Sequence, residues 1–124
     1  MSRYVMIALG GAAGAIARYQ LAAMVQARVP AGFPWGTFVV NISGCFVMGI
    51  VMTLLSDRLG TNPNWRYLVP IGFIGAYTTF STFEFETFRV ISEGGWWIGA
   101  TNVAGSVAVG YLALWAGVVL TRAL

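Results

Sequence analysis

The chain has 124 residues, of which 58% are hydrophobic and only 9% are charged. Because a soluble domain carries about a quarter of its residues as Asp, Glu, Lys and Arg, this composition indicates that lipid is the main solvent. The chain has no His and one Cys, which excludes a Cys/His zinc site and an internal disulfide. The net charge of +3 comes from arginines scattered singly along the chain, and this pattern argues against nucleic-acid binding.

Long apolar stretches alternate with short connections, and a helix needs roughly 20 residues to cross the hydrocarbon. The first connection holds the helix breakers Pro30, Gly32 and Pro34, and the second is polar, with Thr61 or Asn62 as the cap of the helix that follows. We therefore expect an all-α membrane protein of one domain, 1–124, with four transmembrane helices. They are expected at about 4–26, 35–56, 64–90 and 96–121.

Short connections predict an up-down-up-down arrangement with both termini on one side of the membrane. Positive charge near the helix ends sets the orientation of such a protein. Four arginines on the terminal side against two on the other make a weak bias, which permits insertion in both orientations. The terminal side carries Arg3, Arg58, Arg66 and Arg122, and the other side carries Arg28 and Arg89.

The first helix combines a packing motif with a charge. Gly10 and Gly14 form a GxxxG step, and Gly95 and Gly99 form a similar step at the start of the fourth helix, so backbones can approach closely there. Arg18 lies about 21 Å along the first helix at 1.5 Å per residue. It is either an anchor whose side chain reaches the interface or a cation near an anion entry route.

The third helix has the most unusual sequence of the four. Two glycines, Gly72 and Gly75, precede four hydroxyl residues within residues 78–82, where a plain span would have Leu and Val. Pro70 has already removed one backbone donor. We expect this helix to be broken near 75–79, because unwound backbone at membrane depth is tolerated where it is buried or lines a cavity.

Polar groups within the expected spans are mainly hydrogen-bond donors. Thr37 and Asn41 share one face of the second helix, and Asn102 and Ser106 share one face of the fourth, since each pair is four residues apart. The positive edges of the Phe80 and Phe83 rings add to these donors. No acidic residue lies mid-span, and a path of donors without carboxylates suits a small anion.

Three motifs in order resemble those of the CrcB/Fluc family of fluoride channels. Residues 11–19, GAAGAIARY, are similar to the family's G-x-x-G-x-x-x-R-[YFW], and residues 36–44, GTFVVNISG, to its G-T-x-x-x-N-x-x-G. Residues 72–86, GFIGAYTTFSTFEFE, resemble G-F-x-G-x-x-T-T-F-S-T-F-x-x-E. The resemblance implies an antiparallel homodimer with two pores that lowers cytoplasmic fluoride, in a cell inner or plasma membrane.

The resemblance also implies roles for individual residues. Gly75 and Thr78 would give backbone carbonyls to a structural Na⁺ on the dimer axis, and Arg18 would stand at the anion entry. The family often has Tyr four residues before the serine of the fourth helix, and this chain has Asn102, which can donate a hydrogen bond but lacks the ring. The expected fluoride path consists of Asn41, Phe80, Phe83, Ser106, Thr37, Thr82, Thr79, Asn102 and, in a vestibule, Glu86.

Three other functions are weighed against passive fluoride transport. A four-helix drug or cation exporter needs a mid-membrane Glu, typically on the first helix, where this chain has Arg18 and no acid. An assembly subunit held by GxxxG contacts leaves the hydroxyl cluster after Gly75 unexplained. An enzyme is the least favoured, because no nucleophile–base pair or metal cluster can be assembled without His and with a single Cys. We therefore expect a channel and no enzymatic activity.

Overall fold

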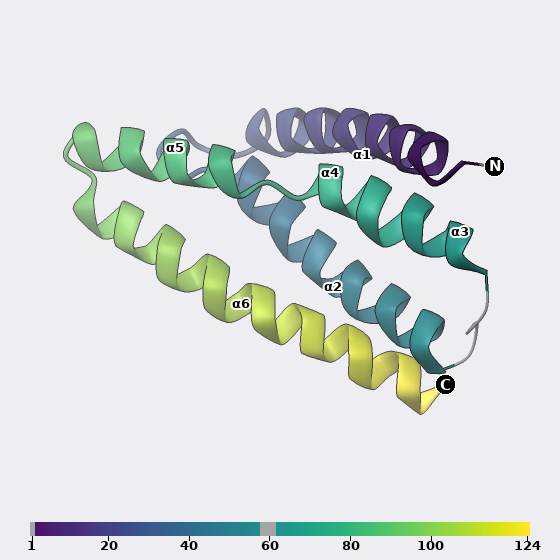
Figure 1. Cartoon of the computed structure of the whole chain (residues 1–124). Coiled ribbons are helices and arrows are strands. Elements are labelled where there is room, and N and C mark those ends of the chain that lie inside the picture. Colours follow the sequence, from purple (N-terminus) through teal and green to yellow (C-terminus); the bar gives the residue numbers. More distant parts are fainter. Residues whose placement is uncertain (1, 58–61) are drawn as a thin grey trace.

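The computed structural model describes residues 2–57 and 62–124, and its regular elements are helices (Figure 1). Asn62 caps the third helical segment, as one of the two expected caps, whereas Thr61 and Arg58 lie outside the described residues. The bounds lie within two residues of those expected from the sequence. The elements are α1 (Arg3–Gln26), α2 (Trp35–Asp57), α3 (Pro63–Arg66), η1 (Tyr67–Ile74), α4 (Gly75–Tyr77), α5 (Phe80–Ser92) and α6 (Trp96–Ala123).

The third transmembrane helix is broken, as the sequence predicts. Its first half runs through α3, the π-helical segment η1 and α4, with Pro70 inside η1. Thr78 and Thr79 then leave the helical conformation, with φ/ψ of −79°/154° and −147°/118°. Helix α5 begins at Phe80, and the Thr79 hydroxyl caps it by accepting a hydrogen bond from the Thr82 N–H.

Glycines set the distances between neighbouring helices. A Cβ added to Gly10 or Gly14 would lie 2.1 Å from a carbonyl oxygen of η1, so α1 and η1 touch backbone to backbone. Gly49 and Gly117 bring α2 and α6 together in the same way. A Cβ added to either glycine would lie 2.2 or 2.3 Å, respectively, from a carbonyl oxygen of the facing helix. The GxxxG step of the first helix thus packs within the chain, as expected for close helix contacts in lipid.

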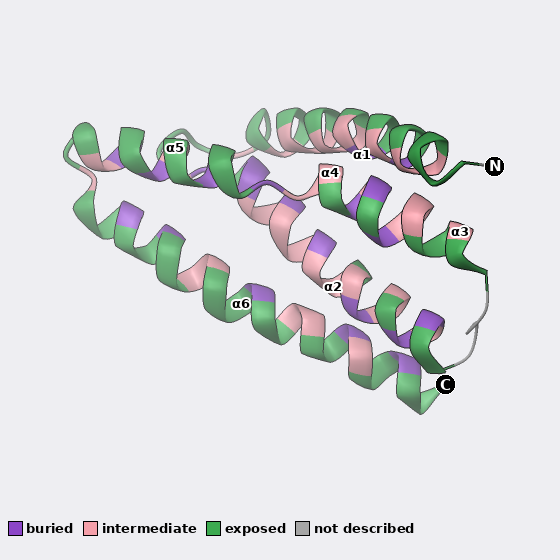
Figure 2. Ribbon diagram, in the orientation of Figure 1, coloured by how far each residue is buried: buried purple, intermediate pink, exposed green. Residues whose placement is uncertain are grey.

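Much of the outer surface of the helices is exposed (Figure 2), and the exposed residues include large apolar ones such as Trp97, which is 86% exposed. Helices α1, α2 and α6 are each long and apolar enough to cross a membrane, and α3 to α5 together form the remaining span, which is the interrupted third one in chain order. Both termini lie at the same end of the bundle (Figure 1). This arrangement is that of a four-helix membrane protein with the lipid as its apolar solvent.

Candidate ion-permeation site

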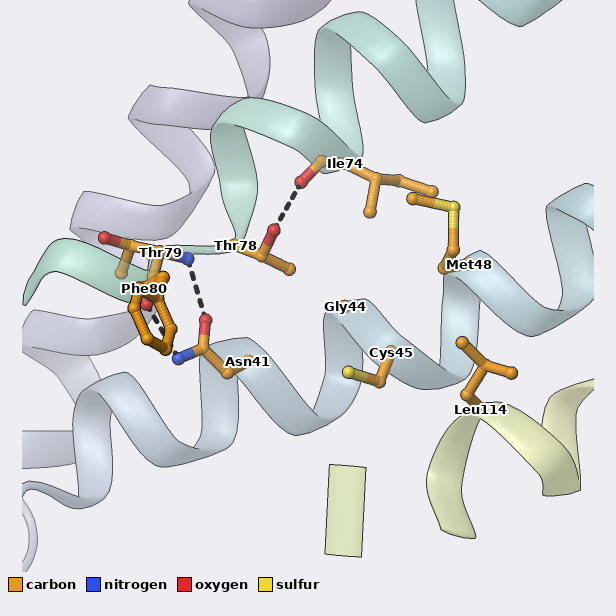
Figure 3. Close-up of a pocket in the computed structure, with 9 residues that line it drawn as sticks. All are labelled: Asn41, Gly44, Cys45, Met48, Ile74, Thr78, Thr79, Phe80 and Leu114. Carbon is orange, nitrogen blue, oxygen red and sulfur yellow. Dashed lines mark hydrogen bonds between the residues drawn. The ribbon is translucent and has the colours of Figure 1, made fainter. Parts of the chain in front are cut away.

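The side chain of Asn41 on α2 holds the break in the third helix. Its Nδ2 donates to the Thr79 carbonyl at 3.0 Å, and its Oδ1 accepts from the Thr79 N–H at 2.8 Å (Figure 3). One amide group therefore replaces two backbone partners that the unwound residue has lost. We call this pair of hydrogen bonds the Asn41–Thr79 clasp. The sequence predicted the break but not the clasp.

The break also changes the surroundings of two carbonyls. In a continuous α-helix the Gly75 carbonyl would accept from the N–H of Thr79, and the Thr78 carbonyl from that of Thr82. Here the Thr79 N–H donates to Asn41, and the Thr82 N–H donates to the Thr79 hydroxyl at 3.3 Å. The carbonyls of Gly75 and Thr78 thus lack their usual helical donors. They are hard oxygen ligands of the kind that a dehydrated cation accepts.

A cavity of about 280 Å³, here the break cavity, opens beside the clasp (Figure 3). Most of its lining is apolar, and the polar side chains come from the clasp and from Thr78, whose hydroxyl donates to the Ile74 carbonyl at 3.0 Å. An ion next to this cavity would find few donors besides the clasp. The lining residues are Asn41, Gly44, Cys45, Met48, Ile74, Thr78, Thr79, Phe80 and Leu114.

A second cavity of about 310 Å³, here the arginine cavity, gathers five of the predicted site residues. Arg18 from α1, Thr37 from α2, and Thr79, Thr82 and Glu86 from the third helix all line it. Thr79 also lines the break cavity, so the two cavities adjoin at the break. The rest of the lining consists of Ala15, Tyr19, Ala22, Ala23 and Val40.

Glu86 brings a carboxylate to the arginine cavity. Its Oε2 is buried and has no hydrogen-bond partner among the described residues. Arg18 supplies a positive charge to the same cavity, and the Thr82 hydroxyl accepts a hydrogen bond from that of Thr79 at 3.1 Å. The cavity therefore combines a cation, hydroxyl groups and one acid.

Phe80 and Phe83 lie on the first turn of α5, with ring centroids 5.8 Å apart and planes inclined at 44°. The two rings have different surroundings. Phe83 is 6% exposed and packs inside the chain, whereas Phe80 is 74% exposed and borders the break cavity. The pair thus extends from the interior of the subunit to its surface beside the break.

A chain of hydrogen bonds links α5 to α6 away from both cavities. The Thr87 hydroxyl donates to the Phe83 carbonyl at 2.8 Å and accepts from Asn102 Nδ2 at 2.9 Å. The Ser106 hydroxyl donates to Asn102 Oδ1 at 3.3 Å. Asn102 is 1% exposed, so its amide is buried between the two helices. Thr87 was not among the residues predicted from the sequence, although its place four residues after Phe83 puts it on the same helix face.

The predicted site residues therefore fall into three groups in space. One group surrounds the break and its clasp, a second lines the arginine cavity, and a third forms the α5–α6 chain. Thr79 joins the first two groups, and Phe83 joins the third to the region of the break through its neighbour Phe80. The arrangement offers a series of hydrogen-bond donors and ring edges across four helices.

Comparison with known proteins now places the chain in a family. Residues 5–118 match the family described as CrcB-like protein, Camphor Resistance (CrcB). The chain belongs to the CrcB-like family. Three similar members are each named fluoride-specific ion channel FluC. That of Solibacter usitatus is 54% identical over 97% of this chain and 98% of its own length.

The other two relatives also match over most of their length. The protein of Acidobacterium capsulatum is 45% identical over 95% of this chain and 94% of its own. That of Geobacter sulfurreducens is 41% identical over the whole of both chains. Family membership confirms the resemblance found in the three motifs of the sequence.

Proposed function

We propose that this protein is a fluoride channel that lets fluoride leave the cytoplasm by passive permeation. The observation that supports this most strongly is the identity of 54% to a relative named as a fluoride-specific ion channel, over nearly the whole of both chains. The donors around the break support the same conclusion, because fluoride is small and strongly hydrated. A pore for it must replace water with donors at close range.

The proposed path runs through the arginine cavity and past the clasp. Arg18 attracts the anion electrostatically, and Thr37 and Thr82 donate to it inside the cavity. Asn41 uses one Nδ2 hydrogen for the Thr79 carbonyl and keeps the other for the ion, because an amide nitrogen carries two donors. The edges of Phe80 and Phe83 then carry fluoride towards Ser106 and Asn102. Weak sites in series allow the ion to leave as well as to enter.

The proposed working form is an antiparallel homodimer with two pores, inserted in the inner or plasma membrane. The single chain leaves the Phe80 ring and Gly75 exposed beside the break, where a second subunit would cover them. The weak arginine bias permits the two opposite orientations that such a dimer needs. Cross-linking and tag accessibility test this directly, and a population of molecules that all face one way would contradict it.

A structural Na⁺ is proposed at the dimer axis, held by the Gly75 and Thr78 carbonyls of each subunit. The donor set fits such an ion, because these carbonyls have lost their helical partners and no carboxylate is required. The ion would supply positive potential near both pores without lying on either anion path. Replacing sodium by a larger organic cation is expected to weaken the dimer, as measured by its elution volume and melting temperature.

Fluoride efflux from liposomes tests the proposed function. Vesicles loaded with potassium fluoride and containing only this protein are treated with valinomycin, and external fluoride is followed with an electrode. We expect fast efflux that depends on valinomycin, because passive anion movement needs a balancing cation flow. Efflux no faster than from protein-free vesicles, or equal efflux from vesicles loaded with chloride, would refute a fluoride channel.

A further inference from the structure

The α5–α6 hydrogen-bond chain has a direction that matters for an anion. In the structure the three hydrogen bonds run in one direction, from Ser106 to Asn102 within α6, from Asn102 across to Thr87 on α5, and from Thr87 to the Phe83 carbonyl within α5. The Ser106 proton is therefore occupied by Asn102 Oδ1. A serine in this state presents only lone pairs to its surroundings, and lone pairs repel fluoride.

The same three side chains can carry the opposite direction. If the Asn102 amide turns over, Nδ2 donates to the Ser106 oxygen and Oδ1 accepts from the Thr87 hydroxyl. Ser106 then has its proton free for an anion. The Phe83 carbonyl loses the Thr87 hydroxyl but keeps the backbone N–H of residue 87, its partner in the regular helix. No covalent bond changes, and every buried polar group stays paired.

We propose that Thr87, Asn102 and Ser106 form a reversible relay in which Thr87 is the positioning residue that allows Ser106 to donate to fluoride. This inference rests on the proposed fluoride channel and explains how the Ser106 hydroxyl on α6 becomes a donor in its path. Thr87 suits the role because a hydroxyl both donates and accepts, so it can serve either orientation of the amide. Asn102 suits it because its two ends differ in polarity and nearly coincide in shape.

Burial makes the reversal of the Asn102 amide depend on the Thr87 hydroxyl. Thr87 is 6% exposed and Asn102 is 1% exposed, so water cannot replace a missing partner at that end of the relay. Ser106 is only half-buried, so its hydroxyl is accessible to the proposed ion. Without the Thr87 hydroxyl, the resting amide would leave Nδ2 unpaired and the reversed amide would leave Oδ1 unpaired, and either loss is unfavourable in this interior. The state in which Ser106 has its proton free would then contain an unpaired buried group, so Ser106 would donate to the anion less readily.

A double-mutant cycle on fluoride efflux tests the relay. Thr87→Val is expected to slow efflux about tenfold, as is Ser106→Ala, since each removes about one net hydrogen bond from the station. The double variant should be no slower than Ser106→Ala alone, because Thr87 acts only through Ser106. Thr87→Ser restores the hydroxyl and should restore efflux. Additive effects of the two substitutions, or wild-type efflux in Thr87→Val, would overturn the proposal.

Matched controls separate the relay from simple helix packing. Thr53 is also a buried threonine that donates to the carbonyl four residues earlier, Gly49, at 2.7 Å, but it lies on α2. Thr53→Val should leave efflux unchanged. If Thr87→Val does not elute with the wild type, the cycle is run with Thr87→Cys, whose thiol is a weak hydrogen-bond partner. If the wild-type protein gives no fluoride efflux, the proposed channel itself is refuted. If the wild type gives efflux and Thr87→Val gives the same rate, only the relay is refuted.

Discussion

Removing the Asn41 side chain should disable both the pore and the broken helix. Asn41→Ala deletes the clasp and leaves the N–H and the carbonyl of Thr79 without partners, although Thr79 is only 8% exposed. Each unpaired buried group costs about 1–3 kcal/mol, so the loss is roughly 2–6 kcal/mol before relaxation. We therefore expect a severe loss of fluoride efflux, at least about tenfold if only 1.4 kcal/mol of it is felt by the ion.

Measuring both fluoride efflux and the melting temperature separates two roles of Asn41, binding the ion and holding the break. If Asn41 only binds the ion, Asn41→Ala loses efflux but has the same melting temperature as the wild type. If the clasp also holds the break, as the two short hydrogen bonds require, the melting temperature falls as well. Asn41→Asp keeps the shape and can still accept from the Thr79 N–H, but it cannot donate to the carbonyl and adds a negative charge. It should block efflux more completely than Asn41→Ala.

The assay is fluoride efflux from liposomes, read together with the elution volume and thermal melting of each purified variant. Cys45→Ala provides the control, because Cys45 lines the break cavity, as Asn41 does, but lies one turn further along α2 and outside the clasp. It should transport fluoride at the wild-type rate. Wild-type efflux and wild-type melting of Asn41→Ala together would refute the reasoning from the clasp.

Three further substitutions test other parts of the structure. Phe80→Ile should cut efflux severely by removing a ring edge beside the break, whereas Phe88→Ile, an exposed ring further along α5, should not; equal rates for both would contradict the assigned path. Gly14→Ala should lower the melting temperature, because its Cβ would lie 2.1 Å from the Phe73 carbonyl and overpacking costs about 1–3 kcal/mol. Gly11→Ala is the matched control, since its Cβ would meet nothing closer than 3.9 Å, and similar melting of the two variants would refute the packing argument. Arg18→Gln should slow efflux most at low ionic strength, because screening already weakens electrostatic attraction in high salt; a salt-independent effect would remove its role at the anion entry.

The sequence alone determined the solvent, the number of spans and the place of the break. Long apolar stretches with few charges give the helices, and their ends follow from breakers and caps that act within a few residues. Gly72, Gly75 and the hydroxyl residues after them weaken the third helix locally, so its interruption could be predicted without its neighbours. The three motifs likewise indicated the family without any knowledge of the tertiary structure, because each is a short local pattern.

The tertiary structure decided which polar groups meet. Asn41 lies 38 positions from Thr79, and nothing in the local sequence shows that its amide replaces the lost backbone partners of the break. Thr87 looks like an ordinary helical threonine until α6 brings Asn102 against it. Hydrogen-bond pairing between helices depends on their relative rotation, and close glycine contacts set that rotation only when the whole bundle is assembled. The sequence therefore predicted the donors, and only the packed helices assigned their partners.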